Sequence, residues 1–443
     1  MRCRWLPGLV GITLWGLALS AAPPETVTFN RDIAPLLYRH CVSCHREGGA
    51  GPFPLLTYQD ASRRASLLAA VTARHYMPPW KPEPGHGHFR GARGLTASEI
   101  ALFRRWADGG APAGDVSATP PAPPSSGGEL GEPDLVVKLA EPFAVPADGP
   151  DLYQCFVVPL NLAETKYVKA VSFQPQNPRL VHHAILFQDP SGHAARERDA
   201  AEPGPGYRCF GAPGFLPVGG LGGWSPGARP VPWPAGVALP LRKGADLVVQ
   251  IHFHPTGKPE SEQSTIGLYF SPQPPTRRLA DIPLGSRQID IPPGERAYRV
   301  RDRFTVPVEV EAIGIIPHAH LICKDMKGVA LLPGGSKKWL LWIRDWDFNW
   351  QEQYRYETPV RLPAGTRVEM EFTYDNSAAN VHNPNHPPQR VRYGADTTDE
   401  MAGLHVQVLP VREADYPELA QALWGKLMRS VGGGFFRLEP TER

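Results

Sequence analysis

Three closely spaced pairs of histidines and one methionine are the residues of this chain best suited to hold metal ions. The pairs are His182 and His183, His252 and His254, and His318 and His320, and the methionine is Met401. Imidazole is the commonest protein ligand of transition metals, and the thioether of methionine adds a soft donor. Several imidazoles with a thioether favour copper over zinc, because the soft sulfur suits Cu(I).

The spacing of these histidines decides which of them can act together from one strand. Successive side chains of a strand point to opposite faces, so each pair separated by one residue shares a face. His182 and His183 are instead adjacent, inside the apolar run Val181–Phe187. Their joint action on one ion requires a twist or a bulge at this point. Without one, a histidine buried in the core is the simpler interpretation.

A second kind of chemistry is indicated by Cys41-Val42-Ser43-Cys44-His45. C-x-x-C-H is the attachment motif for c-type haem, in which two thiols add to the haem vinyl groups and the histidine binds the iron. A bare C-x-x-C redox pair and half of a zinc site are the alternatives. The adjacent histidine and the export signal described below favour haem, so we expect one covalent haem on Cys41, Cys44 and His45.

The residues around this motif predict a small helical domain. Asp32–Leu37 predicts a short amphipathic helix that leads into the motif. Thr96 and Glu99 form a capping box, which predicts a closing helix from there to about Trp106. Residues 28–112 therefore resemble a small class I-like cytochrome c domain.

Met77 is the expected second axial ligand of the haem iron. It precedes Pro78 and Pro79, which favour an extended loop able to hold a thioether over the haem face. Ligation by methionine and histidine raises the haem potential. Three histidines are rival ligands: His75, His86 and His88.

The N-terminus predicts export from the cytoplasm. Arg2 and Arg4 precede an apolar run over residues 6–19, and small residues follow at 20–22. This is the pattern of a secretory signal peptide, so we expect residues 1–22 to be removed and the mature chain to be periplasmic or otherwise exported. No later run reaches the length of a membrane span. Cysteine pairing is permitted in such a compartment, and Cys155 and Cys209 are the expected disulfide.

The rest of the chain predicts a multidomain protein rich in strands. Residues 113–132 are dominated by proline, glycine and serine, as in a semi-rigid linker. From residue 133 onward, short alternating segments are separated by proline and glycine, which favours antiparallel β-sandwiches. Examples of the expected strands are Leu135–Lys138, Leu247–His252, Thr265–Phe270, Tyr298–Val300 and Arg367–Tyr374. A net charge of +2 indicates neither nucleic acid nor an anionic membrane as a partner.

The order of these motifs is similar to that of one enzyme family. Residues 133–409 resemble the type II copper, ascorbate-dependent monooxygenases, which include the peptidylglycine α-hydroxylating and dopamine β-monooxygenases. The resemblance rests on His-His, then Gln-x-His, then His-x-His, then Asp-Glu-Met. The positions of Cys155 and Cys209, before and after the His-His strand, also resemble a family disulfide.

The resemblance implies two jelly-roll-like sandwich domains, residues 133–275 and 276–425, each with one copper and a solvent-filled cleft between them. The implied ligands of the electron-transfer copper are His182, His183 and His252. Those of the copper that activates dioxygen, the implied catalytic residues, are His318, His320 and Met401. His254 has no ligand counterpart, and His382, His386 and Cys323 receive no role.

Two departures from the family pattern concern the substrate. The peptide-amidating members bind a substrate carboxylate through an arginine two residues before His-x-His, where this chain has Ile316. They also use an asparagine and a tyrosine after the methionine, where this chain has Gly403 and His405. We therefore expect a small organic substrate other than a peptidylglycine.

The sequence as a whole favours a copper monooxygenase that hydroxylates an aliphatic C–H bond with dioxygen. Its electrons would reach the copper of His182, His183 and His252 through the fused haem domain, from an ascorbate-like reductant or a periplasmic redox protein. A tethered one-electron carrier has a local concentration of roughly millimolar. The alternative is a non-enzymatic copper-binding or electron-transfer cytochrome.

Overall fold

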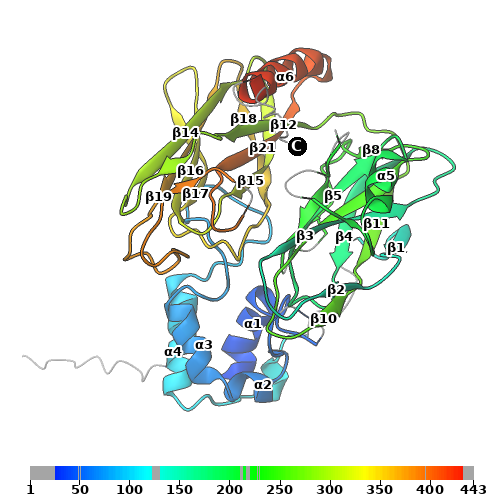
Figure 1. The fold of residues 1–443 in the computed structure, drawn as a ribbon. Coiled ribbons are helices and arrows are strands. Elements are labelled where there is room, and N and C mark those ends of the chain that lie inside the picture. Colours follow the sequence, from blue (N-terminus) through cyan, green and yellow to red (C-terminus); the bar gives the residue numbers. More distant parts are fainter. Residues whose placement is uncertain are drawn as a thin grey trace, which may run out of the picture.

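The computed structural model describes residues 25–432 except 48, 50, 122–129, 210–212, 216–219, 227, 229 and 395. Two β-rich lobes lie side by side, and a group of helices lies below them in the view of Figure 1. The expected signal peptide, residues 1–22, and the centre of the expected linker lie outside the described residues. Within the described part of the chain, no helix is long and apolar enough to cross a membrane.

A small helical unit forms the N-terminal part of the described chain. After a π-helical turn at Phe29–Ile33, its helices are α1 (Ala34–His40), α2 (Tyr58–Ser62), α3 (Ala65–Ala73) and α4 (Ala97–Asp108). The expected capping box is confirmed, because the side chains of Thr96 and Glu99 each accept a hydrogen bond from the other's backbone N–H. The buried side chains of the unit include Leu37, Phe103 and Trp106.

Antiparallel sheets make up both β lobes, which confirms the strand-rich fold expected from the sequence. In the N-terminal sandwich, one sheet has the order β1 (Leu135–Lys138), β11 (Thr265–Ser271), β4 (Lys166–Gln174), β8 (Leu239–Leu241). The other has the order β6 (Tyr207–Arg208), β3 (Leu152–Pro159), β9 (Asp246–Phe253), β5 (Val181–Asp189), β7 (Gly220–Trp224). A short ribbon of β2 (Phe143–Val145) and β10 (Glu260–Glu262) and the helix α5 (Ala194–Ala200) complete the lobe.

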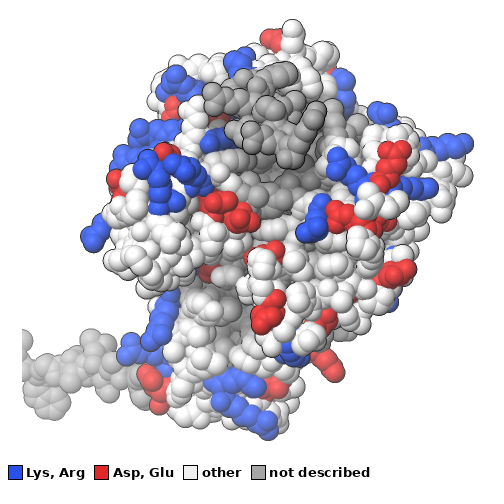
Figure 2. Space-filling model, viewed as in Figure 1, with Lys and Arg blue, Asp and Glu red and all other residues white. Residues whose placement is uncertain are grey.

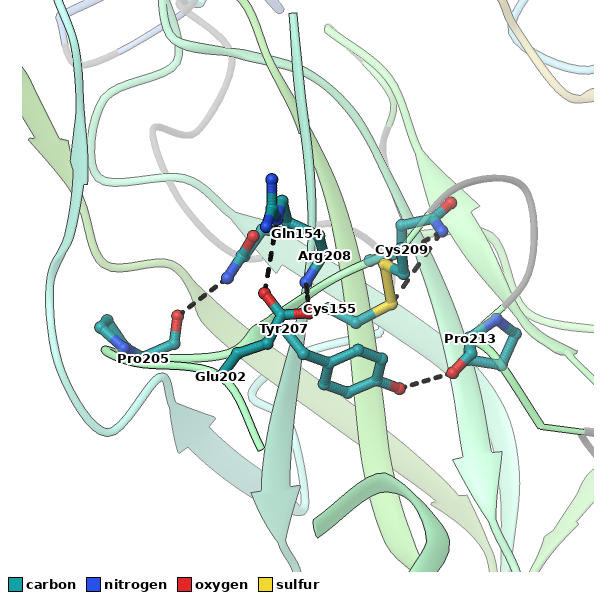
Figure 3. Close-up of a disulfide and its surroundings, with 9 residues drawn as sticks. Gln154, Cys155, Glu202, Pro205, Tyr207, Arg208, Cys209 and Pro213 are labelled. Carbon is teal, nitrogen blue, oxygen red and sulfur yellow. Dashed lines mark hydrogen bonds and ion pairs between the residues drawn. A yellow bond between two sulfur atoms is a disulfide. The ribbon is translucent and has the colours of Figure 1, made fainter. Parts of the chain in front are cut away.

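The predicted disulfide is confirmed in this sandwich. Cys155 on β3 is bonded to Cys209, which follows β6, with the two Cα atoms 5.8 Å apart (Figure 3). Next to it, the hydroxyl of Tyr207 donates a 2.6 Å hydrogen bond to the carbonyl of Pro213. The disulfide thus anchors the edge strand β6 to β3, the strand that lies beside β9.

The C-terminal sandwich also consists of two four-stranded antiparallel sheets. One has the order β12 (Ala280–Gly285), β21 (Gly403–Pro410), β15 (Val310–His318), β18 (Tyr354–Leu362). The other has the order β14 (Tyr298–Thr305), β19 (Arg367–Tyr374), β16 (Cys323–Leu331), β17 (Lys337–Ile343). The short pair β13 (Asp290–Ile291) and β20 (Val391–Arg392) and the C-terminal helix α6 (Tyr416–Gly432) complete it.

A segment of the N-terminal unit, residues 80–93, packs into the C-terminal sandwich. Pro82 forms a bridge with Ile343 at the end of β17, and Phe89 forms one with Tyr356 on β18. Phe89 is buried in the core of that sandwich and stacks on the ring of Tyr356, 5.2 Å between centroids. The segment therefore covers the edge strand of each sheet, a position that would otherwise leave backbone groups unpaired.

The two sandwiches also contact each other directly. Trp233 and Val237 of the first pack against Ile313 and Leu409 of the second in a small apolar cluster. The guanidinium of Arg355 lies 3.6 Å from the centroid of the Trp233 ring. On the face of the molecule in Figure 2, acidic and basic side chains are interspersed rather than gathered by sign.

Candidate metal centre

His182, His183 and His252 converge in the N-terminal sandwich. One nitrogen from each of the three rings lies within 4.8 Å of the others. The two adjacent histidines reach the same place because the pairing of β5 with β9 shifts register between Val181 and His183. This is the irregularity that the sequence required for joint action, since a regular strand would send the two rings to opposite faces.

Neighbouring side chains fix the ring of His252. Its Nε2–H donates a 2.8 Å hydrogen bond to Asp151 Oδ2, and its ring stacks on that of Tyr153 with 4.2 Å between centroids. Its Nδ1 is buried without a hydrogen-bond partner among the described residues. A hydrogen bond at one imidazole nitrogen selects the tautomer that leaves the other free to bind metal.

His254, which follows the end of β9, is not part of the cluster. Its side chain is 67% exposed against 0% for His252, and its Nδ1 donates to Asp151 Oδ1 at 2.8 Å. Burial alone would raise the pKa of Asp151, but the hydrogen bonds and charges of the two histidines lower it. Asp151 is therefore an anion that accepts the hydrogen bond from His252 Nε2–H and so orients the imidazole.

Two rings of the cluster, those of His182 and His183, are held neutral. Desolvation, with the neighbouring His252, lowers the pKa of His182 to about 3 and that of His183 well below its ordinary value. The Nδ1 atoms of these two rings are only 3.2 Å apart. Neutral imidazoles present lone pairs and need not release a proton when a metal binds, so this cluster suits a transition-metal ion.

A second pair of imidazoles, His318 and His320, lies in the C-terminal sandwich with 5.3 Å between ring centroids. His318 Nδ1–H donates to Gln351 Oε1 at 2.5 Å, and His320 Nδ1–H donates to the Asp399 carbonyl at 3.1 Å. Each hydrogen bond leaves the Nε2 of its ring for a ligand. Burial lowers the pKa of both rings, that of His320 to about 3.

Met401 lies on the chain between two points that touch these histidines. Asp399 accepts the hydrogen bond from His320, and Gly403 is the antiparallel partner of His318. The hydroxyl of Tyr374 also donates to the Met401 carbonyl at 2.6 Å, which fixes the backbone there. The fold therefore brings the backbone of Met401 close to the second pair of imidazoles.

The ring of Phe348 contacts imidazoles of both histidine clusters. The ring of Phe348 lies nearly parallel to that of His182, with 4.9 Å between centroids and 19° between planes. The ring of His320 lies edge-on to the same phenyl ring, with 5.7 Å between centroids and 78° between planes. A phenyl ring therefore lies against both clusters, which the sequence resemblance assigned to the two sides of a solvent-filled cleft.

The proposed haem-attachment residues lie at the end of α1. Cys41 and Cys44 are free thiols, and His45 is almost fully buried. His45 Nδ1–H donates to the Phe53 carbonyl at 3.0 Å, which leaves Nε2 available. A Cβ at Gly51 would lie 2.7 Å from His45 Nδ1, so the following loop wraps closely behind the ring. These residues fit the proximal side of a covalently bound haem.

Met77 and its rivals as the second iron ligand lie on the chain that leaves α3. Met77 is half-buried, and its N–H donates to the Val71 carbonyl at 3.2 Å. His86 packs edge-on against the stacked rings of Trp339 and Trp342, 4.6 Å from each centroid, and the His88 carbonyl accepts from Glu357 N–H. Both rival histidines thus lie on the segment that is fixed to the C-terminal sandwich, and His75 is exposed.

Three site residues were not found by sequence reasoning: Asp151, Gln351 and Phe348. Each acts on a histidine that is distant in sequence, and none belongs to a recognisable motif. A weak signal existed for Asp151, because it immediately precedes the strand whose Tyr153 pairs with His252.

Comparison with known proteins does not assign the chain to a family. No family model and no curated protein matches the chain. Solved structures with some similarity include the infectious bursal disease virus VP2 subviral particle, at 8% identity, with 70% of this chain and 91% of that chain covered and a TM-score of 0.17. Another is the structure of the Gx strain of that virus, at 9% identity, 70% and 91% coverage and a TM-score of 0.17. Similarity this low carries no argument about the fold or the function.

Proposed function

We propose that this protein is an exported copper-dependent monooxygenase that hydroxylates an aliphatic C–H bond of a small organic substrate. Its electrons would pass through a covalently attached c-type haem in the N-terminal unit. The reaction inserts one atom of dioxygen into the C–H bond and reduces the other to water, which consumes two electrons and two protons. An ascorbate-like reductant or a periplasmic redox protein would supply the electrons.

The observation that carries the proposal is the presence of two separate imidazole clusters, one on each sandwich. The first would hold copper through His182, His183 and His252, and the second through His318, His320 and Met401. The buried, unpartnered Nδ1 of His252 supports the first assignment, because a buried nitrogen without a partner costs free energy that a bound ion would offset. The thioether of Met401 distinguishes the second cluster from the first and favours Cu(I) there.

The chain's own residues prepare both sites. Asp151, Gln351 and the Asp399 carbonyl orient three of the imidazoles, and desolvation lowers the pKa of both rings of the second cluster. When bound, copper supplies dioxygen binding and one-electron redox chemistry, and haem supplies one-electron storage.

The substrate would differ from the carboxylates bound by the peptide-amidating enzymes. Beside His318 on the sheet lies Ile316, paired with His405 of β21. His405 is hydrogen-bonded at 2.6 Å to Asp281, whose charge raises the pKa of the imidazole. An isoleucine offers no bidentate partner to a carboxylate, so this position favours an apolar part of the substrate.

The test is metal and haem analysis of protein produced in a haem-maturing host, with optical and EPR spectra. One haem and two type II coppers per chain, and oxygen consumption by the reduced protein, are expected. Met401→Ala should abolish oxygen-dependent product while the haem spectrum stays unchanged. One haem and no copper after reconstitution would contradict the proposal and leave an electron carrier.

A further inference from the structure

The loop between β17 and β18, residues 344–353, contacts both histidine clusters. Trp346 Nε1–H donates to the His320 carbonyl at 3.1 Å, and Gln351 Oε1 accepts from His318. Between them in the loop, Phe348 places its ring against His182 of the other sandwich. Because Phe348 also lies against His252, this one short connection touches four of the proposed copper ligands.

The same loop is held by the N-terminal unit through ion pairs, of which two are well shielded from solvent. Lys81 Nζ lies 3.6 Å from Asp347 Oδ2, and both side chains are 16% exposed. Arg93 donates a 2.8 Å hydrogen bond to Glu352, and this pair is similarly shielded. Partly buried pairs of this kind are costly to break, because one charge is then left without its partner.

Phe348 is a buried side chain with an unusual location. It is 8% exposed, yet in the described part of the chain it belongs to the core of neither sandwich. Its contacts are instead aromatic, with the imidazoles of His182, His252 and His320. Ring centroids 4.5–7 Å apart in stacked or edge-to-face arrangements are favourable, so imidazoles of both clusters hold the ring.

We propose that Phe348 is a positioning residue that sets the separation of the two histidine clusters and excludes water from between them. The 344–353 loop transmits to it the position of the N-terminal unit, through Lys81–Asp347 and Arg93–Glu352. That the spacing matters for two copper ions rests on the proposed function. The separation of the two histidine clusters can be tested without copper.

The first experiment measures hydrogen exchange in the full-length, copper-free protein. Phe348→Ala should speed exchange about tenfold, or ~1.4 kcal/mol, in peptides that contain His182 and His320. Phe348→Leu keeps most of the volume and should have a smaller effect. Phe304→Ala is the matched control, because Phe304 is 7% exposed but lies in the core of the C-terminal sandwich.

Two results of this experiment would overturn the proposal. One is unchanged exchange around both His182 and His320 in Phe348→Ala. The other is an equal effect of Phe304→Ala on the His182 peptide, which would indicate general loosening. For the role of the ion pairs, Lys81→Ala and Arg93→Ala should each speed exchange in the 344–353 loop and around His182. Faster exchange that is confined to the helical unit in these two variants would overturn the proposed role of the ion pairs.

The second experiment loads Cu(II) and measures the magnetic interaction between the two ions by EPR. Wild-type protein should give one defined interaction, and Phe348→Ala should broaden or weaken it at unchanged copper content. An identical interaction in Phe348→Ala would refute the spacing role. Wild-type protein that takes up no copper would refute the proposed function, while the exchange experiment would still decide the role of Phe348.

Discussion

Replacement of Asp151 by asparagine tests how the first histidine cluster is prepared for metal. The two carboxylate oxygens of Asp151 each accept a 2.8 Å hydrogen bond, one from His252 and one from His254. Asparagine has the same shape but only one acceptor oxygen and no charge. Its amide N–H groups would face an imidazole N–H, so the tautomer of His252 that exposes Nδ1 would lose its support.

The expected effect of Asp151→Asn is a loss of copper affinity at the first cluster. Loss of a carboxylate that orients a metal-binding histidine typically weakens binding about 10–100-fold. This range corresponds to ~1.4–2.7 kcal/mol, close to the ~1.5–3 kcal/mol of a hydrogen bond to a charged group. Asp151→Asn should therefore weaken copper at the first cluster by this factor and leave the second cluster unchanged.

The assay is competitive titration of copper into the haem-loaded protein, with EPR to separate the two sites. The matched control is Asp148→Asn, three residues earlier and exposed. His254→Ala provides a second control, since Asp151 would keep its bond to His252 and the affinity should change less than about threefold. Unchanged affinity in Asp151→Asn, or an equal loss in Asp148→Asn, would refute the reasoning.

Three further predictions concern stability. In the folded protein the pKa of His320 is about 3, below its ordinary value of 6.5, so its contribution to the free energy of unfolding is complete above pH 6.5 and is lost as the pH falls toward 3. Between pH 7 and pH 5 the free energy of unfolding of the copper-free protein should therefore fall by about 2 kcal/mol through this group. The urea midpoint should fall less over the same pH range in His320→Asn. Cys155→Ser should lower the free energy of unfolding by about 4 kcal/mol, since the bond to Cys209 closes a loop of 54 residues. In this variant, unlike the wild type, a reductant should no longer lower the urea midpoint. Arg93→Ala should lower the free energy of unfolding by about 3 kcal/mol, because Glu352 would stay buried and unpaired. Thermal unfolding should show that the double variant with Glu352→Gln recovers part of this loss.

The strands and helices that carry periodic patterns were predictable from the sequence. Leu135–Lys138 and Arg367–Tyr374 form strands with the expected bounds, and the helix capped by Thr96 extends two residues beyond the expected Trp106. Local alternation and capping determine these elements, so a single sequence suffices to find them.

The geometry around the histidines was only partly predictable. The sequence required a bulge or twist at His182 and His183 but could not show that one exists, because a register shift depends on the partner strand β9. Phe348 and Gln351 lie in a turn rich in tryptophan and aspartate, with no pattern that points to His182 or His318. Such residues are brought to the site by tertiary packing, which sequence periodicity does not encode.

The segment 80–93 shows the same limit most clearly. Half of its residues are proline, glycine or histidine, and the sequence assigns it to the N-terminal unit. Phe89 nevertheless lies in the core of the C-terminal sandwich, and Glu83 N–H donates to the Trp342 carbonyl. Pairing between residues so far apart in the chain leaves no local sign in either partner.

This arrangement has a consequence for the order in which the protein can be assembled. Arg93 and Glu352 are 259 residues apart, so the early segment is synthesised long before the strands that receive it. The C-terminal sandwich therefore cannot close its edges until both ends of the chain are present, and pairing at this separation is slow. The N-terminal unit is thus not a module that could be exchanged or deleted freely. A truncated chain beginning at residue 133 would expose the edges of β17 and β18, which are sites for aggregation.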